Sequence, residues 1–120
     1  MKSPLFLLLL LVAVIYSCTK VIDNPQVTPS NPCSTVTYKT DITPIINQTC
    51  AIKSCHVSGT GEGDYTTYAG LKNDAINGKF KKEVLTNKSM PPRNSNGPNS
   101  LTAAQLEKFT CWINAGSPKN

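Results

Sequence analysis

"DITPIINQTCAIKSCH", residues 41–56, joins a short amphipathic segment to two cysteines and the only histidine of the 120-residue chain. Its apolar residues follow the i, i+3, i+4 spacing of one helix face, and a proline stands where a first helical turn accepts one. These residues are Ile42, Ile45 and Ile46, with Pro44 between them. We therefore predict a helix from about Asp41 to Thr49 that runs directly into Cys50.

A second and a third helix are predicted downstream. "YTTYAGLKNDAING", residues 65–78, favours a short helix around Thr67 to Asp74, although Gly70 weakens its helix propensity. The third helix, from Ala103 to about Ala115, has the clearest signals.

The sequence predicts both the first and the last turn of this helix. Thr102 followed by Gln105 is a capping box, and Leu101 can pack on Leu106 as a hydrophobic staple. Gly116 supplies the stop. The expected apolar stripe contains Leu106, Phe109 and Ile113, with Trp112 beside it.

Long irregular segments separate these helices. Residues 57–64 contain three glycines and must form a loop, whereas residues 79–100 suggest a short extended piece followed by a loop rich in proline and asparagine. We expect an all-α domain over residues 36–120, with three or so short helices. Its apolar side chains are few, so a disulfide, a metal or a cofactor is needed to complete the core.

The N-terminal segment has the layout of an export signal. Residues 5–16 form an apolar run behind a short basic start, which is too short for a lasting transmembrane helix. Residues 15–18 resemble a bacterial lipobox, so we expect a signal peptide over residues 1–17 and a lipid on Cys18. The alternative is an ordinary cleaved signal with Cys18 left free. Residues 18–35, with three prolines, read as a flexible tether to the membrane.

Export places the five cysteines where disulfides form and persist. An odd number asks for a special role for one of them, and lipidation of Cys18 would supply it. If Cys50 and Cys55 are a functional pair, Cys33 and Cys111 remain to bond each other. Such a bridge would contribute about 4 kcal/mol in the chain-entropy model.

The chain carries a formal net charge of +5, and four lysines lie close together in its second half. A basic face of this kind can dock an acidic protein, although a solvated surface is the commoner explanation. Nucleic acid is a poor candidate, because the segment has one aromatic residue and no recognisable binding module. The four lysines are Lys79, Lys81, Lys82 and Lys88.

"CAIKSCH", residues 50–56, is two residues longer than the C-x-x-C-H sequence through which c-type cytochromes attach haem. Cys55 and His56 keep the adjacent thiol and imidazole that such a site needs. Three interpretations are open: covalent haem, which we favour; a structural Cys50–Cys55 disulfide; and zinc held by Cys50, Cys55, His56 and another cysteine. The longer spacing leaves the attachment of Cys50 less certain than that of Cys55.

The whole domain resembles the small cytochrome c-like domains of exported bacterial proteins, including the planctomycete-type family and other class I-like cytochromes c. The resemblance covers about residues 38–117 and rests on four segments in order. They are "DITPIINQTC…SCH", "YTTYAGL", "SMPP" and "LTAAQLEKFTCWINAG". It implies a cytochrome c-like fold around one covalent haem c, with Met90 of the "SMPP" loop as the second axial ligand opposite His56. A thioether is a soft ligand suited to haem iron. The alternative for Met90 is a methionine that fills a gap in the core.

The resemblance implies single-electron transfer rather than catalysis, because protein ligands on both sides leave the iron no open position. We expect a lipid-anchored protein of the cell envelope that faces the periplasm and exchanges electrons with a redox partner protein. Two rivals stay open: a peroxidase-like haem with Met90 unbound, and a disulfide-stapled envelope lipoprotein without cofactor that acts as a binding or structural module.

Overall fold

The computed structural model describes residues 31–120, which are helical and contain no β-strand. The first π-helical segment continues directly into the first α-helix, so the five segments form four helical bodies. In chain order the segments are η1 (Tyr38–Ile42), α2 (Thr43–Thr49), α3 (Tyr68–Ile76), η2 (Lys81–Thr86) and α4 (Ala103–Asn114). The expected all-α class is confirmed for this part of the chain. The predicted signal peptide, Cys18 and most of the predicted tether lie outside the described residues.

The first helical body, η1 with α2, begins earlier than predicted because Thr37 caps it. The Thr37 hydroxyl accepts the backbone N–H of Thr40, and its own N–H donates to Asp41 Oδ2 at 2.9 Å. The predicted apolar stripe is confirmed, since Ile42, Ile45 and Ile46 are all buried in the core. The body ends at Thr49 with Cys50 as its C-cap, as predicted.

Helix α3 lies close to its predicted position, with the Thr67 side chain as its N-cap. Gly70, which seemed to weaken this helix, is required by a close approach of the chain. A Cβ atom at position 70 would lie 1.9 Å from the carbonyl oxygen of Asp64. The absence of a side chain therefore lets the preceding loop pack against the first turn of α3.

The extended piece predicted after residue 79 is wrong, because the chain forms the helical segment η2 there. Phe80 and Val84, spaced i and i+4, are both buried, so this segment has a helical rather than an alternating apolar pattern. The Phe80 ring meets that of Phe109 edge-on, with centroids 5.0 Å apart. The segment from residue 87 to residue 102 is irregular, as predicted.

Helix α4 has the predicted capping box, with both hydrogen bonds between Thr102 and Gln105 present. Its core face is centred on Phe109 and Trp112, whereas Leu106 and Ile113 are only partly buried. Beyond the helix the chain folds back, because the Trp112 indole N–H donates to the carbonyl of Pro118 at 2.9 Å. These contacts fix the C-terminal residues on the domain.

A disulfide joins Cys33 to Cys111, with Cα atoms 4.9 Å apart and 78 residues apart in sequence. It ties the entry of the domain to α4, as the cysteine accounting predicted. Within residues 31–120, no helix is both long enough and apolar enough to cross a membrane.

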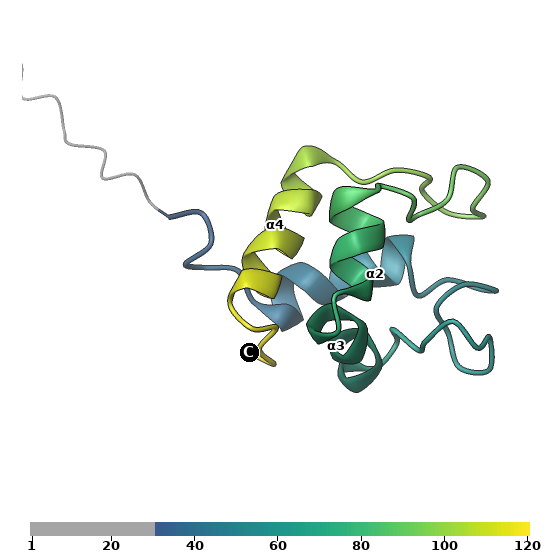
Figure 1. Cartoon of the computed structure of the whole chain (residues 1–120), viewed down its shortest axis with the longest axis horizontal. Coiled ribbons are helices and arrows are strands. Elements are labelled where there is room, and N and C mark those ends of the chain that lie inside the picture. The colour runs from purple at the N-terminus through teal and green to yellow at the C-terminus, as the bar shows by residue number, and fades with distance from the viewer. Residues whose placement is uncertain (1–30) are drawn as a thin grey trace, which may run out of the picture.

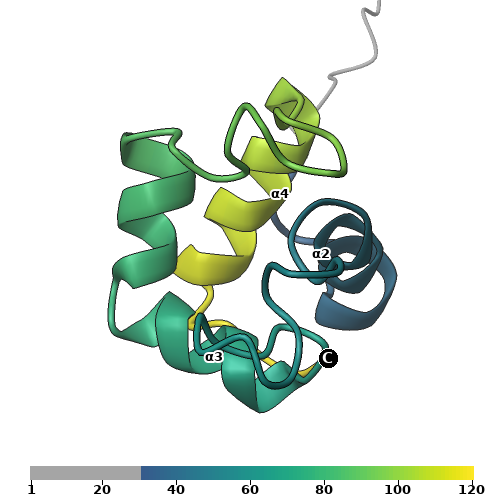
Figure 2. The ribbon, with the colours of Figure 1, turned by 90° about the vertical axis from the view of Figure 1, so that its right-hand side faces the viewer.

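Helix α4 packs between η1 and η2, and α3 lies across one end of this arrangement (Figures 1 and 2). The segments around residues 50–64 and 87–100 extend on the same side of the domain, remote from residues 31–37 (Figure 1). Viewed from that side, the two loops lie in front of the helices (Figure 2). The fold thus brings the residues that follow α2 and those that follow η2 to the same end of the domain.

Candidate functional site

A cavity of about 210 Å³ opens between these two loops and the core. Its lining is mainly apolar and comes from the end of α2, the loop after it, the start of η2 and the loop after η2. It includes Cys50, Cys55, His56 and Met90, the four residues predicted to hold a cofactor. Tyr65 and Phe80 form part of its wall toward the core.

His56 is held in one tautomer by its surroundings. Its Nδ1 lies 2.8 Å from the carbonyl oxygen of Glu62. A carbonyl oxygen only accepts hydrogen bonds, so in the neutral ring Nδ1 carries the proton and Nε2 keeps its lone pair. The ring also stacks on that of Tyr65, with centroids 4.0 Å apart and planes 4° from parallel. His56 can therefore act as a metal ligand through Nε2.

The two additional residues of the C-x₄-C-H sequence are taken up in a turn. The N–H of Cys55 donates to the carbonyl of Ile52 at 3.0 Å, and Ser54 has a positive φ of 68°. The N–H of His56 then donates to the carbonyl of Cys50, also at 3.0 Å. The longer loop thus returns to its starting point, which brings the first cysteine and the histidine together.

Cys50 and Cys55 are both free thiols. Cys50 is 6% exposed and lies 3.3 Å from the Thr49 hydroxyl, whereas Cys55 is partly exposed. Burial raises the pKa of the Cys50 thiol, so Cys50 favours its protonated form. The structural Cys50–Cys55 disulfide considered from the sequence is not formed.

Met90 is 37% exposed, and with Ile76 it is one of the exposed large apolar side chains of residues 31–120. Its backbone is held by η2, because the N–H groups of Ser89 and Met90 both donate to the carbonyl of Glu83, at 2.9 and 3.3 Å. Pro91, immediately after it, is buried. The loop therefore presents the thioether at the cavity while its backbone stays attached to the helix.

The four lysines predicted to dock a partner do not share one location. Lys79 lines the cavity itself, and Lys88 lines a neighbouring hollow that also contains Met90. Lys81 and Lys82 are exposed on η2 but line neither. Two carboxylates, Glu62 and Glu83, also border the cavity. The rim thus carries charges of both signs.

Sequence reasoning missed Tyr65, which stacks on His56, and Asp74, which lies behind Tyr65. The Tyr65 hydroxyl donates to Asp74 Oδ2 at 2.7 Å, and both residues are buried. Burial, followed by this hydrogen bond to the carboxylate, raises the pKa of the Tyr65 phenol far above its usual range. The Tyr65–Asp74 hydrogen bond joins residues nine positions apart, one in a loop and one in a helix, so no periodic pattern in the sequence indicates it.

The donor set fits a haem better than it fits zinc. Within residues 31–120, no three histidine, cysteine or acidic side chains gather closely enough to hold a metal ion by themselves. The zinc interpretation needs a further cysteine, and Cys33 and Cys111 are joined in the disulfide. A haem iron needs only two donors from the protein, and His56 and Met90 are the residues of this cavity that could supply them. The cavity is smaller than most ligand pockets, so the two loops that form its walls must separate to admit a porphyrin.

Searches against models of protein families, curated proteins and solved structures found no match to this chain.

Proposed function

We propose that this protein is a membrane-tethered c-type cytochrome that transfers single electrons. One observation carries the proposal: Cys50, Cys55, His56 and Met90 line a single apolar cavity, although Met90 lies 34 residues after His56. These four residues offer two thiols for thioether bonds and two donors for an iron. A covalent haem c would supply the one-electron chemistry when bound.

The free thiols support attachment rather than cross-linking. The Cys33–Cys111 bridge uses the other two described cysteines, so Cys50 and Cys55 have no remaining cysteine partner among residues 31–120 except each other. The return of the loop from His56 to Cys50 supports a role for both thiols in spite of the longer spacing. In this proposal Cys50 and Cys55 anchor the cofactor covalently.

Two donors among the lining residues support electron transfer rather than catalysis. The Nε2 atom of His56 and the thioether of Met90 would hold the iron of a bound haem, which would leave no position free for a substrate. His/Met ligation favours the reduced iron, because the thioether is a soft donor. Tyr65 and Phe80 give the cavity an aromatic wall toward the core, which suits an apolar porphyrin.

The proposed lipid on Cys18 would increase the rate at which the domain meets its redox partner. A tether of about seventeen residues would confine the domain near the membrane and raise its effective concentration toward a membrane-bound redox partner. We place this partner on the periplasmic side, where an exported lipoprotein resides.

The decisive experiment is the absorption spectrum of the full chain produced together with the haem-attachment machinery. We expect a Soret band that survives acid-acetone extraction, and a low-spin spectrum in both oxidation states. Intact masses of the Cys50→Ala and Cys55→Ala proteins would show which thioether bonds form. A well-folded protein without the Soret band would contradict the proposal and favour the cofactor-free lipoprotein. A high-spin spectrum with ready cyanide binding would favour the peroxidase-like alternative.

A further inference from the structure

Tyr65 and Asp74 form a buried pair that nothing in the proposed electron transfer requires. Tyr65 is 5% exposed and Asp74 is 6% exposed. A carboxylate in such a position costs free energy unless it is paired or well hydrogen-bonded. Its neighbours are the Tyr65 hydroxyl at 2.7 Å, the Asn77 amide at 3.4 Å and the Lys79 ammonium at 3.9 Å. The shortest of these three contacts is the hydrogen bond that Asp74 accepts from Tyr65, so Tyr65 is its main partner.

Tyr65 in turn holds His56 from two directions. Its backbone N–H donates to the His56 carbonyl at 3.0 Å, and its ring lies parallel to the imidazole at a centroid distance of 4.0 Å. The Glu62 carbonyl fixes Nδ1 in the plane of the ring. This hydrogen bond still allows the imidazole to tilt, and the stacked phenol opposes that tilt because it covers one face of the ring.

The Tyr65 ring is itself held at both of its ends. Asp74 on α3 accepts from the hydroxyl, while the body of the ring packs toward Phe80 at a centroid distance of 6.1 Å. A contact chain therefore runs from helix α3 through Asp74 and Tyr65 to His56. The loop between residues 57 and 64 contributes the Glu62 carbonyl, and the contact chain from α3 adds a second constraint on the imidazole.

We propose that Tyr65 is a positioning residue for His56, and that Asp74 fixes Tyr65 in turn, so that helix α3 sets the plane of the imidazole. The inference rests on the proposed function only for its consequence at the iron. In the haem-loaded protein the plane of an axial imidazole determines the anisotropy of the ferric electron paramagnetic resonance spectrum. In the haem-free chain the stacking moves the His56 ring-proton resonances upfield.

The test compares three variants of the full chain. Tyr65→Leu removes the stacked ring, Tyr65→Phe keeps the ring but loses the hydrogen bond to Asp74, and Tyr68→Leu removes a tyrosine that bonds Ser117 elsewhere in the domain. In the haem-free chain we expect Tyr65→Leu to abolish the upfield shift of His56 and Tyr65→Phe to retain it. In the loaded protein we expect Tyr65→Leu to change the anisotropy, and Tyr65→Phe to broaden the signal without moving it.

The Tyr68→Leu protein should leave both His56 signals unchanged, which separates positioning from a general loss of packing. Equal spectra for the Tyr65→Leu and Tyr68→Leu proteins would overturn the inference. If the Tyr65→Leu protein does not fold, the Tyr65→Phe protein alone decides the test. An electron paramagnetic resonance signal that is not broadened in the loaded Tyr65→Phe protein would overturn the inference. Failure of the proposed function is recognised separately, because a chain that attaches no haem still shows the His56 ring-proton shift.

Discussion

Substitution of Met90 should have a small effect on stability, because its side chain is exposed, and a large effect on the haem spectrum, because of its proposed role. Because its side chain is 37% exposed, Met90→Ala should change the free energy of unfolding of the haem-free chain by no more than about 1 kcal/mol. In the haem-loaded protein the same change should convert a low-spin spectrum to a high-spin or ligand-exchanged one and admit cyanide. Absorption spectra and urea unfolding check both expectations.

Ile76 offers the matched control for Met90, since it is 64% exposed and does not line the cavity. Ile76→Ala removes an exposed apolar side chain away from the cavity, so its spectrum should stay low-spin. A Met90→Ala protein that stays low-spin would contradict the role of Met90 as an iron ligand.

Gly70 gives a stability prediction that opposes helix propensity. Alanine is the best helix former, yet a Cβ atom at position 70 would lie 1.9 Å from the Asp64 carbonyl oxygen. Gly70→Ala should therefore lower the free energy of unfolding by about 2 kcal/mol, as overpacking does. Asn73→Ala, on an exposed position of the same helix, should be neutral or slightly stabilising. Two equal urea midpoints would contradict this account.

The candidate ligands could be found from the sequence, whereas their supports could not. Cys50, Cys55 and His56 stand out by residue type and spacing, and Met90 was proposed through the family resemblance of its loop. The structure brings all four to one cavity. Tyr65 stood within a predicted segment without any distinguishing signal. Its contacts depend on how the loop after His56 returns to α3, which no local propensity determines.

At the scale of elements, the helix with a capping box was easier to predict than the segment without a side-chain cap. The capping box of α4 identified its first turn, because both side chains bond locally. Segment η2 was missed for the opposite reason. It has no side-chain cap, and its lysines flank a single phenylalanine in a pattern that also fits a strand. Its helical form depends on the burial of Phe80 and Val84 against α4, which is a tertiary effect.

An ion pair joins η1 to α4 and makes their contact sensitive to acid. The Lys108 ammonium lies 2.8 Å from Asp41, and this contact, together with the Thr37 N–H, lowers the pKa of Asp41 from 3.8 to about 2. A lowered pKa stabilises the fold above pH 4, and this contribution is lost as the pH falls toward 2. Because Lys108 is 44% exposed, we expect a contribution of only about 1 kcal/mol.

Asp41→Asn keeps an acceptor for Thr37 but removes the charge, so it should be less stable than wild type at pH 6 and equally stable near pH 2. Urea unfolding across this pH range checks the expectation. Glu107→Gln, at an exposed position on α4, is the control and should track wild type throughout. A pH-independent deficit in the Asp41→Asn protein would mean that the charge is not the cause.

For the whole molecule, the Cys33–Cys111 disulfide compensates for a small core. It closes a loop that contains all the described helices up to α4, so it restricts the unfolded chain strongly. Cys33→Ala should lower the free energy of unfolding by about 4 kcal/mol. Because Cys33 is exposed, the substitution leaves no buried cavity. Under reducing conditions wild type and variant should unfold at the same urea concentration, and a deficit that persists there would point to lost packing instead.

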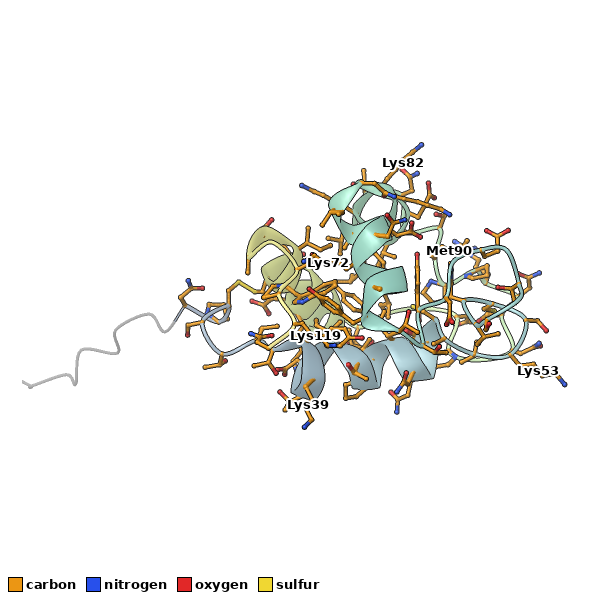
Figure 3. The ribbon with its side chains drawn as sticks, turned by 90° about the horizontal axis from the view of Figure 1, so that it is seen from below. Lys39, Lys53, Lys72, Lys82, Met90 and Lys119 are labelled. Carbon is orange, nitrogen blue, oxygen red and sulfur yellow. A yellow bond between two sulfur atoms is a disulfide. The ribbon has the colours of Figure 1, made fainter. Side chains whose placement is uncertain are left out.

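The charge distribution over the domain gives the last prediction, which rests on the proposed function. Lys79 and Lys88 lie at or beside the cavity, whereas Lys39 lies on η1 toward the other end of the domain from Met90 (Figure 3). Lys82 projects outward from η2 in the same view. If electrons leave through the cavity, only the first two lysines should steer a charged oxidant strongly, since fields from exposed charges decay over about 10 Å at moderate salt.

Oxidation of the reduced protein by ferricyanide, an anion, and by tris(phenanthroline)cobalt(III), a cation, separates steering from damage to the site. Lys79→Glu and Lys88→Glu should each slow the reaction with ferricyanide several-fold at low salt and accelerate the reaction with the cobalt complex. Both effects should fade as salt is added, because screening removes the steering. Lys39→Glu, which reverses the same charge at a distance from the cavity, should change neither rate appreciably. Equal effects of all three substitutions would show that net charge, rather than a route through the cavity, governs the encounter.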